Sequence, residues 1–251
     1  KRVAKVLASN EVGAFYNANF ISCRINNENP DETVLITEKK LLVSGTPTFF
    51  FFDTNEKLIH FCGANQETSY YIREGKNALD PSKQAATVAE RYKLGERKIA
   101  SLFLYSQLAQ MYQDEKLVTQ LANDLYDKID KNKLGTKESF IILKNCVNDI
   151  DNGFFKFWVD HIEIAETFAD KSHGLTPTYI LGNIITQSLN REESNTWDLE
   201  KIQEVKSFIV KTKLNPNPIS FLWQKGATLL FKLHKDEEAM RLGNTLLNDS
   251  T

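Results

Sequence analysis

Cysteine is scarce in this sequence, and the cysteines that are present form no Cys-x-x-Cys motif. The 251 residues include three, Cys23, Cys62 and Cys146, and these lie far apart. Because free cysteine is commonly buried, we expect small buried hydrophobic side chains, with Cys23 and Cys62 in strands and Cys146 on a helix. The alternative, a reactive thiol, requires exposure and a positive neighbour.

Long apolar runs and an excess of charge of one sign are also absent. No apolar stretch approaches the roughly 20 residues that span a bilayer, which predicts a soluble chain without a membrane span. The 31 Lys and Arg nearly balance the 33 Asp and Glu, leaving a formal net charge of -2. Such a chain has no field that attracts polyanions, so nucleic acid is not an expected partner.

Motifs for metals and nucleotides are missing as well. The glycines form no phosphate-binding loop, and the histidines have no ligand spacing with one another or with the cysteines. We therefore expect no metal site and no cofactor, with the four histidines solvated or packed: His60, His161, His173 and His234. The aromatic cluster at residues 154–158 could bind a ligand, but aromatic residues at helical spacing are more often core.

The composition is that of a globular protein, 41% hydrophobic and 25% charged. Residues 1–80 mix helix and strand signals, whereas residues 81–251 show helical periodicity almost without interruption. We place the boundary at Asp80-Pro81-Ser82. The predicted fold class is therefore α+β followed by all-α.

The run Val43-Ser44-Gly45-Thr46-Pro47-Thr48 precedes four phenylalanines and Asp53. Proline cannot donate to a central ladder, so Pro47 belongs at the start of a strand. Residues 49–52 are apolar without alternation, which suits a strand covered on both faces. Residues 53–56 form a polar turn that leads into a second, antiparallel strand at 57–62.

Around this hairpin we expect a helix ending at residues 17–19, a strand at 20–25, a helix at 34–42 and a helix at 70–79. This order, together with the run at residues 12–21 (VGAFYNANFI), resembles the thioredoxin-like family of Bacteroidetes type. The resemblance covers about the first 80 residues. It implies a cis Thr46–Pro47 bond, and it implies that Thr46 and Pro47 bind an extended substrate opposite a redox cysteine pair. The alternative is that this loop has a structural role only, as a turn that sets the direction of the following strand.

The resemblance also implies that the first strand and the cysteine pair of the family would lie upstream of Lys1, which is not a methionine. In the family this strand runs between the strands matching residues 20–25 and 49–52. We expect residues upstream of Lys1 to supply it, because unpaired strand edges invite association. The opposing hypothesis is a minimal sheet in which those two strands pair directly.

The second part predicts successive amphipathic helices joined by short polar breaks. Thr176-Pro177 reads as an N-cap followed by a first-turn proline, and a break is expected at 215–218. The last two helices loosely resemble a tetratricopeptide hairpin, although no 34-residue period runs through the region. We therefore expect the second part to form an array of stacked helical hairpins. The expected helices centre on residues 99–109, 118–129, 140–150, 154–169, 177–185, 199–209, 222–233 and 239–246.

Two functions of different classes agree with these features. One is thiol-disulfide exchange by an extracytoplasmic, periplasmic oxidoreductase whose Cys-x-x-Cys lies upstream, with this chain alone redox-inactive. Its partner would be a protein or peptide, bearing a disulfide in the redox case. The other is a noncatalytic binding module that uses the helical array and a redox-dead thioredoxin-like domain to recognise a protein or peptide.

Overall fold

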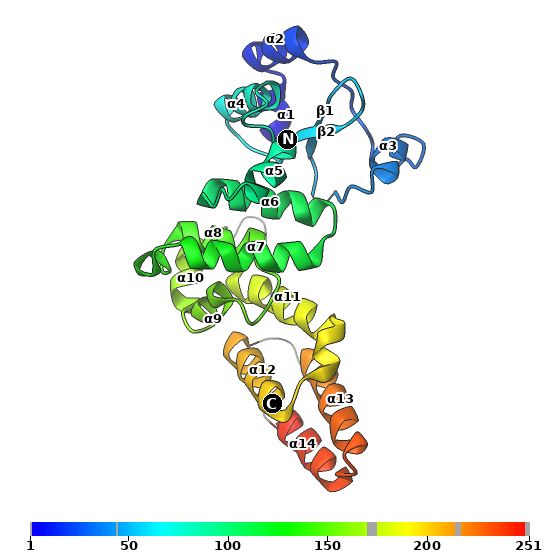
Figure 1. Cartoon of the computed structure of the whole chain (residues 1–251), viewed down its shortest axis with the longest axis vertical. Helices are drawn as coiled ribbons and strands as arrows, with labels where there is room; N and C mark the ends of the chain where they lie inside the picture. The colour runs from blue at the N-terminus through cyan, green and yellow to red at the C-terminus, as the bar shows by residue number, and fades with distance from the viewer. Residues whose placement is uncertain (1, 44, 170–174, 214–216, 249–251) are drawn as a thin grey trace. The chain divides into compact units, whose positions relative to one another are not determined.

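A computed structural model describes residues 2–43, 45–169, 175–213 and 217–248. These residues are mostly helical, and their sheet is a single antiparallel pair (Figure 1). The chain divides into two compact units, Lys1–Leu117 and Val118–Thr251. Both strands precede residue 80 and helices alone follow it among the described residues, so the expected α+β and all-α content is confirmed. The boundary at Asp80-Pro81-Ser82 stays a prediction.

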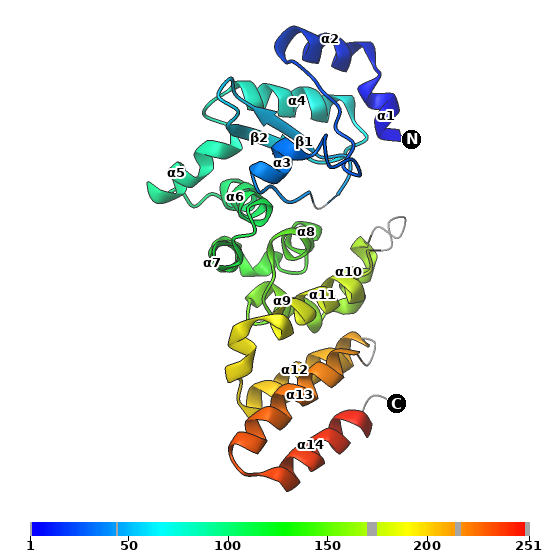
Figure 2. The ribbon, with the colours of Figure 1, turned by 90° about the vertical axis from the view of Figure 1, so that its right-hand side faces the viewer.

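The first unit surrounds the β1–β2 hairpin with short helices. Figure 2 shows α4 alongside the hairpin, and α4 also packs on α2. The elements are α1 (Arg2–Leu7), α2 (Asn10–Asn19), α3 (Val34–Glu38), β1 (Phe49–Phe52), β2 (Leu58–Cys62), α4 (Thr68–Leu79), the 3₁₀ turn η1 (Ala85–Thr87), α5 (Val88–Lys93) and α6 (Ile99–Met111). The predicted hairpin and the helix at 70–79 are therefore confirmed.

One predicted strand of this unit was wrong, and two predicted helices differ in their limits. Residues 20–25 lie outside any strand, because they have no partner strand among the described residues, and Cys23 is exposed there. The helix at 34–42 ends at Glu38, since Lys40 adopts a left-handed conformation with φ 54° and Leu41 N donates back to Ile36 O at 3.0 Å. The first helix is broken into α1 and α2 before Asn10.

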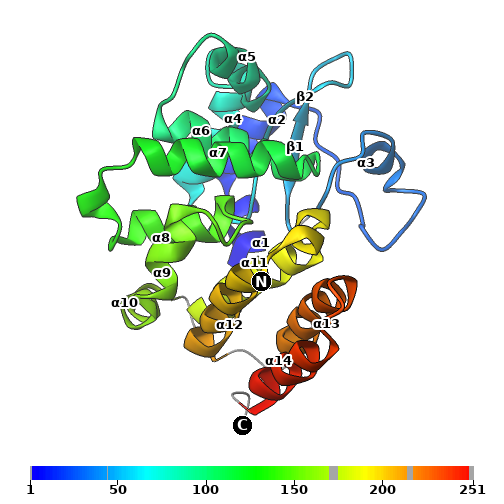
Figure 3. The same ribbon diagram turned by 60° about the horizontal axis from the view of Figure 1, so that its bottom comes forward.

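The second unit is a succession of helices in which α11, α12, α13 and α14 pack consecutively; Figure 3 shows α13 beside α14. The helix expected at 154–169 is interrupted between Val159 and Ile162. The helix expected at 140–150 ends earlier, at Cys146. The elements are α7 (Glu115–Lys128), which begins in the first unit, η2 (Lys131–Lys133), α8 (Lys137–Cys146), α9 (Gly153–Val159), α10 (Ile162–Phe168), α11 (Pro177–Asn190), η4 (Glu192–Thr196), α12 (Leu199–Thr212), α13 (Asn217–Lys232) and α14 (Asp236–Asn248).

The predicted start of α11 is confirmed, since Thr176 Oγ1 accepts a hydrogen bond from Tyr179 N at 3.1 Å and Pro177 opens the helix. Core packing is also the role of the aromatic cluster: Phe154, Phe155 and Trp158 are fully buried. Several sequence features lie outside the described residues, namely Lys1, Ser44, His173, and Asn215 with Pro216 in the predicted break.

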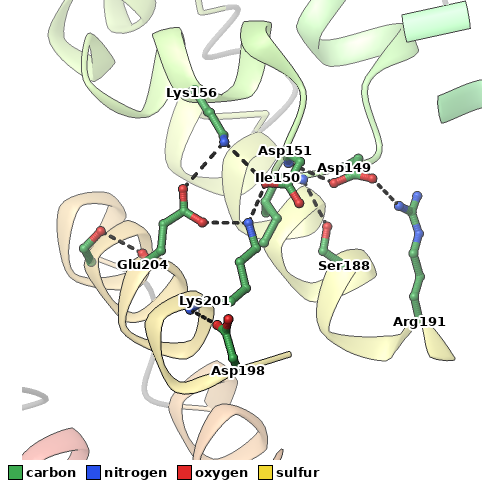
Figure 4. Close-up of polar contacts among 10 residues, drawn as sticks. Asp149, Ile150, Asp151, Lys156, Ser188, Arg191, Asp198, Lys201 and Glu204 are labelled. Carbon is green, nitrogen blue, oxygen red and sulfur yellow. Dashed lines mark hydrogen bonds and ion pairs between the residues drawn. The ribbon is translucent and has the colours of Figure 1, made fainter. Parts of the chain in front are cut away.

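The loop at residues 147–152 joins four helices of the second unit through polar contacts. Ile150 N donates to Ser188 Oγ at 3.2 Å, and Arg191 Nη1 lies 2.9 Å from Asp149 Oδ2 (Figure 4). The Asp151 carboxylate forms ion pairs with Lys156 of α9 and Lys201 of α12. Hydrogen bonds to a loop replace the secondary-structure bonds that its backbone lacks, so this loop fixes how α9, α11 and α12 meet.

Asn152 ties the same loop to α7 and begins α9. Its Oδ1 accepts from Phe154 N at 2.9 Å, and its Nδ2 donates to Asn123 Oδ1 at 2.8 Å. We expect Asn152→Ala to lower the free energy of unfolding by about 1–3 kcal/mol, because a buried helix cap and a part-buried hydrogen bond are lost together. Urea denaturation measures this change. The control Asn132→Ala, at an exposed position, should change stability by less than about 0.5 kcal/mol; equal effects would contradict the role of Asn152.

Candidate functional site

The loop that carries Thr46 and Pro47 lies directly before β1 and is exposed. Its Thr46–Pro47 peptide bond is cis, as predicted. Thr48 Oγ1 donates a hydrogen bond to Gly45 O at 2.5 Å, which closes the loop on itself. The two residues expected to bind a substrate are therefore accessible, and their backbone is held by a local side-chain contact.

β1 pairs along one edge only. It runs antiparallel to β2, with Phe49 opposite Cys62 and Phe51 opposite His60, and the register shifts between Phe51 and Phe52. The other edge of β1 faces no strand within the described part of the chain. Residues 21–25 likewise make no backbone hydrogen bond to any described residue. Direct pairing of the two segments, the opposing hypothesis, is therefore not observed.

The aromatic residues around β1 are only partly covered. Phe20 packs on Phe51 with ring centroids 5.3 Å apart, and Phe49 packs on Tyr71 at 5.2 Å. Among residues 49–52, however, Phe51 alone is buried, and Ile21 is fully exposed (104%). Four consecutive phenylalanines suit a strand buried on both faces, so the described residues leave this strand short of cover.

The three cysteines form no disulfide and no pair. Cys62 and Cys146 are buried, whereas Cys23 is exposed in the segment 20–25. Burial, with a smaller contribution from the nearby Glu74 carboxylate, raises the pKa of the Cys62 thiol to about 12. Because the thiolate is the nucleophile, Cys62 is a poor one at neutral pH. The expectation of buried cysteines is confirmed for Cys62 and Cys146 and wrong for Cys23.

A buried histidine and a carboxylate connect β2, α4 and η1. His60 Nε2 lies 3.1 Å from Glu74 Oε2, and Ala85 N donates to His60 Nδ1 at 3.3 Å. This pattern assigns the ring proton to Nε2, which then donates to Glu74. Burial by itself raises the pKa of Glu74, but hydrogen bonds from His60, Arg73 and Asn77 together lower it below its usual value.

Sequence reasoning left His60 as either solvated or packed, and it missed the partner of this residue. The sequence signal was present on α4, where Glu74 follows the buried Tyr71 by three residues and precedes the buried Ala78 by four. A carboxylate on the buried face of a helix requires a donor, and His60 on the neighbouring strand supplies one. His60 is buried, Glu74 is half-buried, and the pair joins three elements, so it stabilises the hairpin rather than forming an accessible acid-base site. No group of three metal-ligating side chains occurs among the described residues, and none of the described helices is long and apolar enough to cross a bilayer.

Thiol exposure can be measured directly. We expect one rapidly reacting thiol in the native protein with an aromatic disulfide reagent, and all three thiols after denaturation, because only Cys23 is accessible. In the Cys23→Ser variant the rapid native reaction should disappear. Two rapidly reacting thiols in the folded protein would contradict the burial of Cys62 and Cys146.

Glu74 should make stability depend on pH. Since its pKa is lowered in the folded state from 4.5, its contribution is complete above that pH and is lost as the pH falls through the folded value. Glu74→Gln should lower the free energy of unfolding by about 1–3 kcal/mol at neutral pH, and this difference should shrink below pH 4.5. Urea denaturation across this range measures it.

The matched control is Glu67→Gln, which alters an exposed carboxylate beside the same helix that makes no cap hydrogen bond. It should change stability little at any pH. A Glu74→Gln effect that stays constant from neutral to acid pH would show that the carboxylate charge is not what the site uses.

Comparison with known proteins gives no match: no family model, no curated protein and no solved structure matches the sequence. The resemblance to thioredoxin-like proteins therefore stays a prediction from residues 12–21 and from the proline loop. Function has to be argued from the exposed loop, the one-sided strand and the state of the cysteines.

Proposed function

We propose that this chain is the substrate-binding part of a thioredoxin-like protein that exchanges thiols and disulfides through a Cys-x-x-Cys preceding residue 1. The observation that carries the proposal is the pair of open edges, at β1 and at residues 21–25, which no described strand fills. In the resembled family a strand runs between the matching segments and leads to the redox cysteines. A strand added there would also cover the half-buried phenylalanines of β1.

The exposed loop suits the recognition step. An extended polypeptide can pair its backbone with the accessible main chain of Thr46, while Pro47 contributes a carbonyl but no N–H. A partner held in this way would place its disulfide at the start of β1. Protein or peptide partners, rather than small molecules, fit this mode of binding.

The exchange needs thiols that this chain does not offer. A thiolate of the upstream pair attacks one sulfur of the partner disulfide, forms a mixed disulfide and releases the other sulfur as a thiolate. The thiolate of the second cysteine then attacks the sulfur of the first cysteine and releases the partner's remaining sulfur as a thiolate, so the pair becomes a disulfide and the partner a dithiol. Cys62 and Cys146 are buried, and Cys23 is a single thiol. The chain by itself should therefore not catalyse thiol-disulfide exchange.

Disulfide exchange also suggests a compartment. Stable disulfides persist mainly in oxidising environments outside the cytosol, so the proposal includes a periplasmic or other extracytoplasmic location. The other candidate is a noncatalytic binding module with a redox-dead thioredoxin-like domain.

The test is reduction of insulin by dithiothreitol in the presence of the protein that includes its natural residues before Lys1. We expect catalysis by this longer protein and none by residues 1–251. Pro47→Ala in the longer protein should lower the rate about tenfold, because a misplaced substrate backbone weakens the attack geometry. Pro81→Ala, at an exposed turn outside the Thr46–Pro47 loop, should leave the rate unchanged.

Two results would contradict the proposal. One is a natural upstream sequence without a cysteine pair, and the other is a longer protein that fails to accelerate insulin reduction. Either result would favour the noncatalytic binding module.

A further inference from the structure

The second unit contains a surface groove of about 680 Å³ between α12 and α14, with α13 beneath it. From α12 it is lined by positions that recur every three or four residues, and from α14 by the first two turns. Leu230 of α13 and Glu238, Arg241 and Leu242 of α14 complete the lining among the described residues.

The floor of the groove is apolar. Leu199 and Leu242 pack against the buried cluster of Ala227, Leu230 and Ala239. Val210 remains 48% exposed. Three neighbouring helices thus offer a partly uncovered hydrophobic surface, which proteins use for binding when polar residues surround it.

The polar side chains that line the groove include three basic ones, Lys206, Lys211 and Arg241, and one carboxylate, Glu238. Lys211 contacts Asp160, and Arg241 contacts Glu237 at 3.8 Å. These partners are exposed, and exposed ion pairs contribute at most about 1 kcal/mol. The carboxylates of a ligand can therefore replace Asp160 beside Lys211 and Glu237 beside Arg241 at little cost.

The geometry points to a binding site for an acidic amphipathic helix of another protein. Groove residues of α12 extend from Leu199 to Lys211, which corresponds to about 18 Å of helix. A helix seated across α12 and α14 repeats the packing by which successive helices of this unit bury their apolar stripes. Its apolar face would cover the floor, and its carboxylates would meet the basic side chains of the groove. This inference does not depend on the redox proposal.

The experiment is a display selection of random peptides of about 16 residues, or roughly four helical turns, against the whole chain. We expect binders with Leu, Ile or Phe at helical spacing and acidic residues between them. In fluorescence anisotropy, their affinity should fall with added salt and fall at least about tenfold for the double variant Lys206→Glu/Arg241→Glu. The control Lys144→Glu/Lys232→Glu makes the same charge change at exposed sites outside the groove, and should bind normally.

If the double variant fails to fold by circular dichroism, Val210→Asp tests the same surface with one exposed change. The inference is overturned if no peptide is selected, if the selected peptides lack acidic residues, or if the groove variants bind as tightly as the control. A dimer of the chain that Lys206→Glu/Arg241→Glu dissociates would also overturn it, because a second copy would then occupy the groove.

Discussion

The pairing of β1 with β2 along one edge only is the constraint on which the account of the first unit depends. The backbone edge of a strand needs a hydrogen-bonding partner, and its apolar side chains need cover. Within the described residues, β1 pairs along one edge and buries one of its four phenylalanines. Its four consecutive phenylalanines are typical of a central strand that is covered on both faces of a sheet. The hairpin nevertheless keeps its register, because His60, Glu74 and the backbone of Ala85 fix β2 from the other side.

The two units present different kinds of surface. The first presents an exposed main-chain loop before a strand, which suits an extended partner. The second presents an apolar groove that basic side chains also line, which suits a helix. Each surface lies within one unit, and both proposals assign it a polypeptide partner. A near-neutral total charge is consistent with such partners, since only the groove needs to be basic.

The hairpin and the longer helices could be predicted from sequence because their signals are local. Phe49 to Phe52, a polar turn and a second apolar run specify a strand pair, and Thr176-Pro177 specifies a helix start. The ends of helices were harder to predict. Shortly after α3, α6 and α13 end, Lys40, Gln113 and His234 adopt left-handed conformations. Glycine usually occupies such positions, so the usual sequence signal for a helix end is missing.

The wrong strand at residues 20–25 has a different cause. Its apolar residues favour an extended backbone, but a strand exists only where a neighbour supplies hydrogen bonds. Of the candidate site, the proline loop and its exposure followed from sequence, whereas the partner of His60 required the spatial relation of β2 to α4. The groove could not be predicted either, since it depends on how α12 and α14 lie over α13.

The central claim is that a strand belongs between β1 and residues 21–25. Amide hydrogen exchange followed by NMR tests it most directly, by comparing residues 1–251 with the longer natural protein. The account predicts that amides of residues 21–25 exchange rapidly in the shorter chain and become protected in the longer one, together with additional amides of β1. Unchanged rapid exchange in the longer protein would contradict the claim.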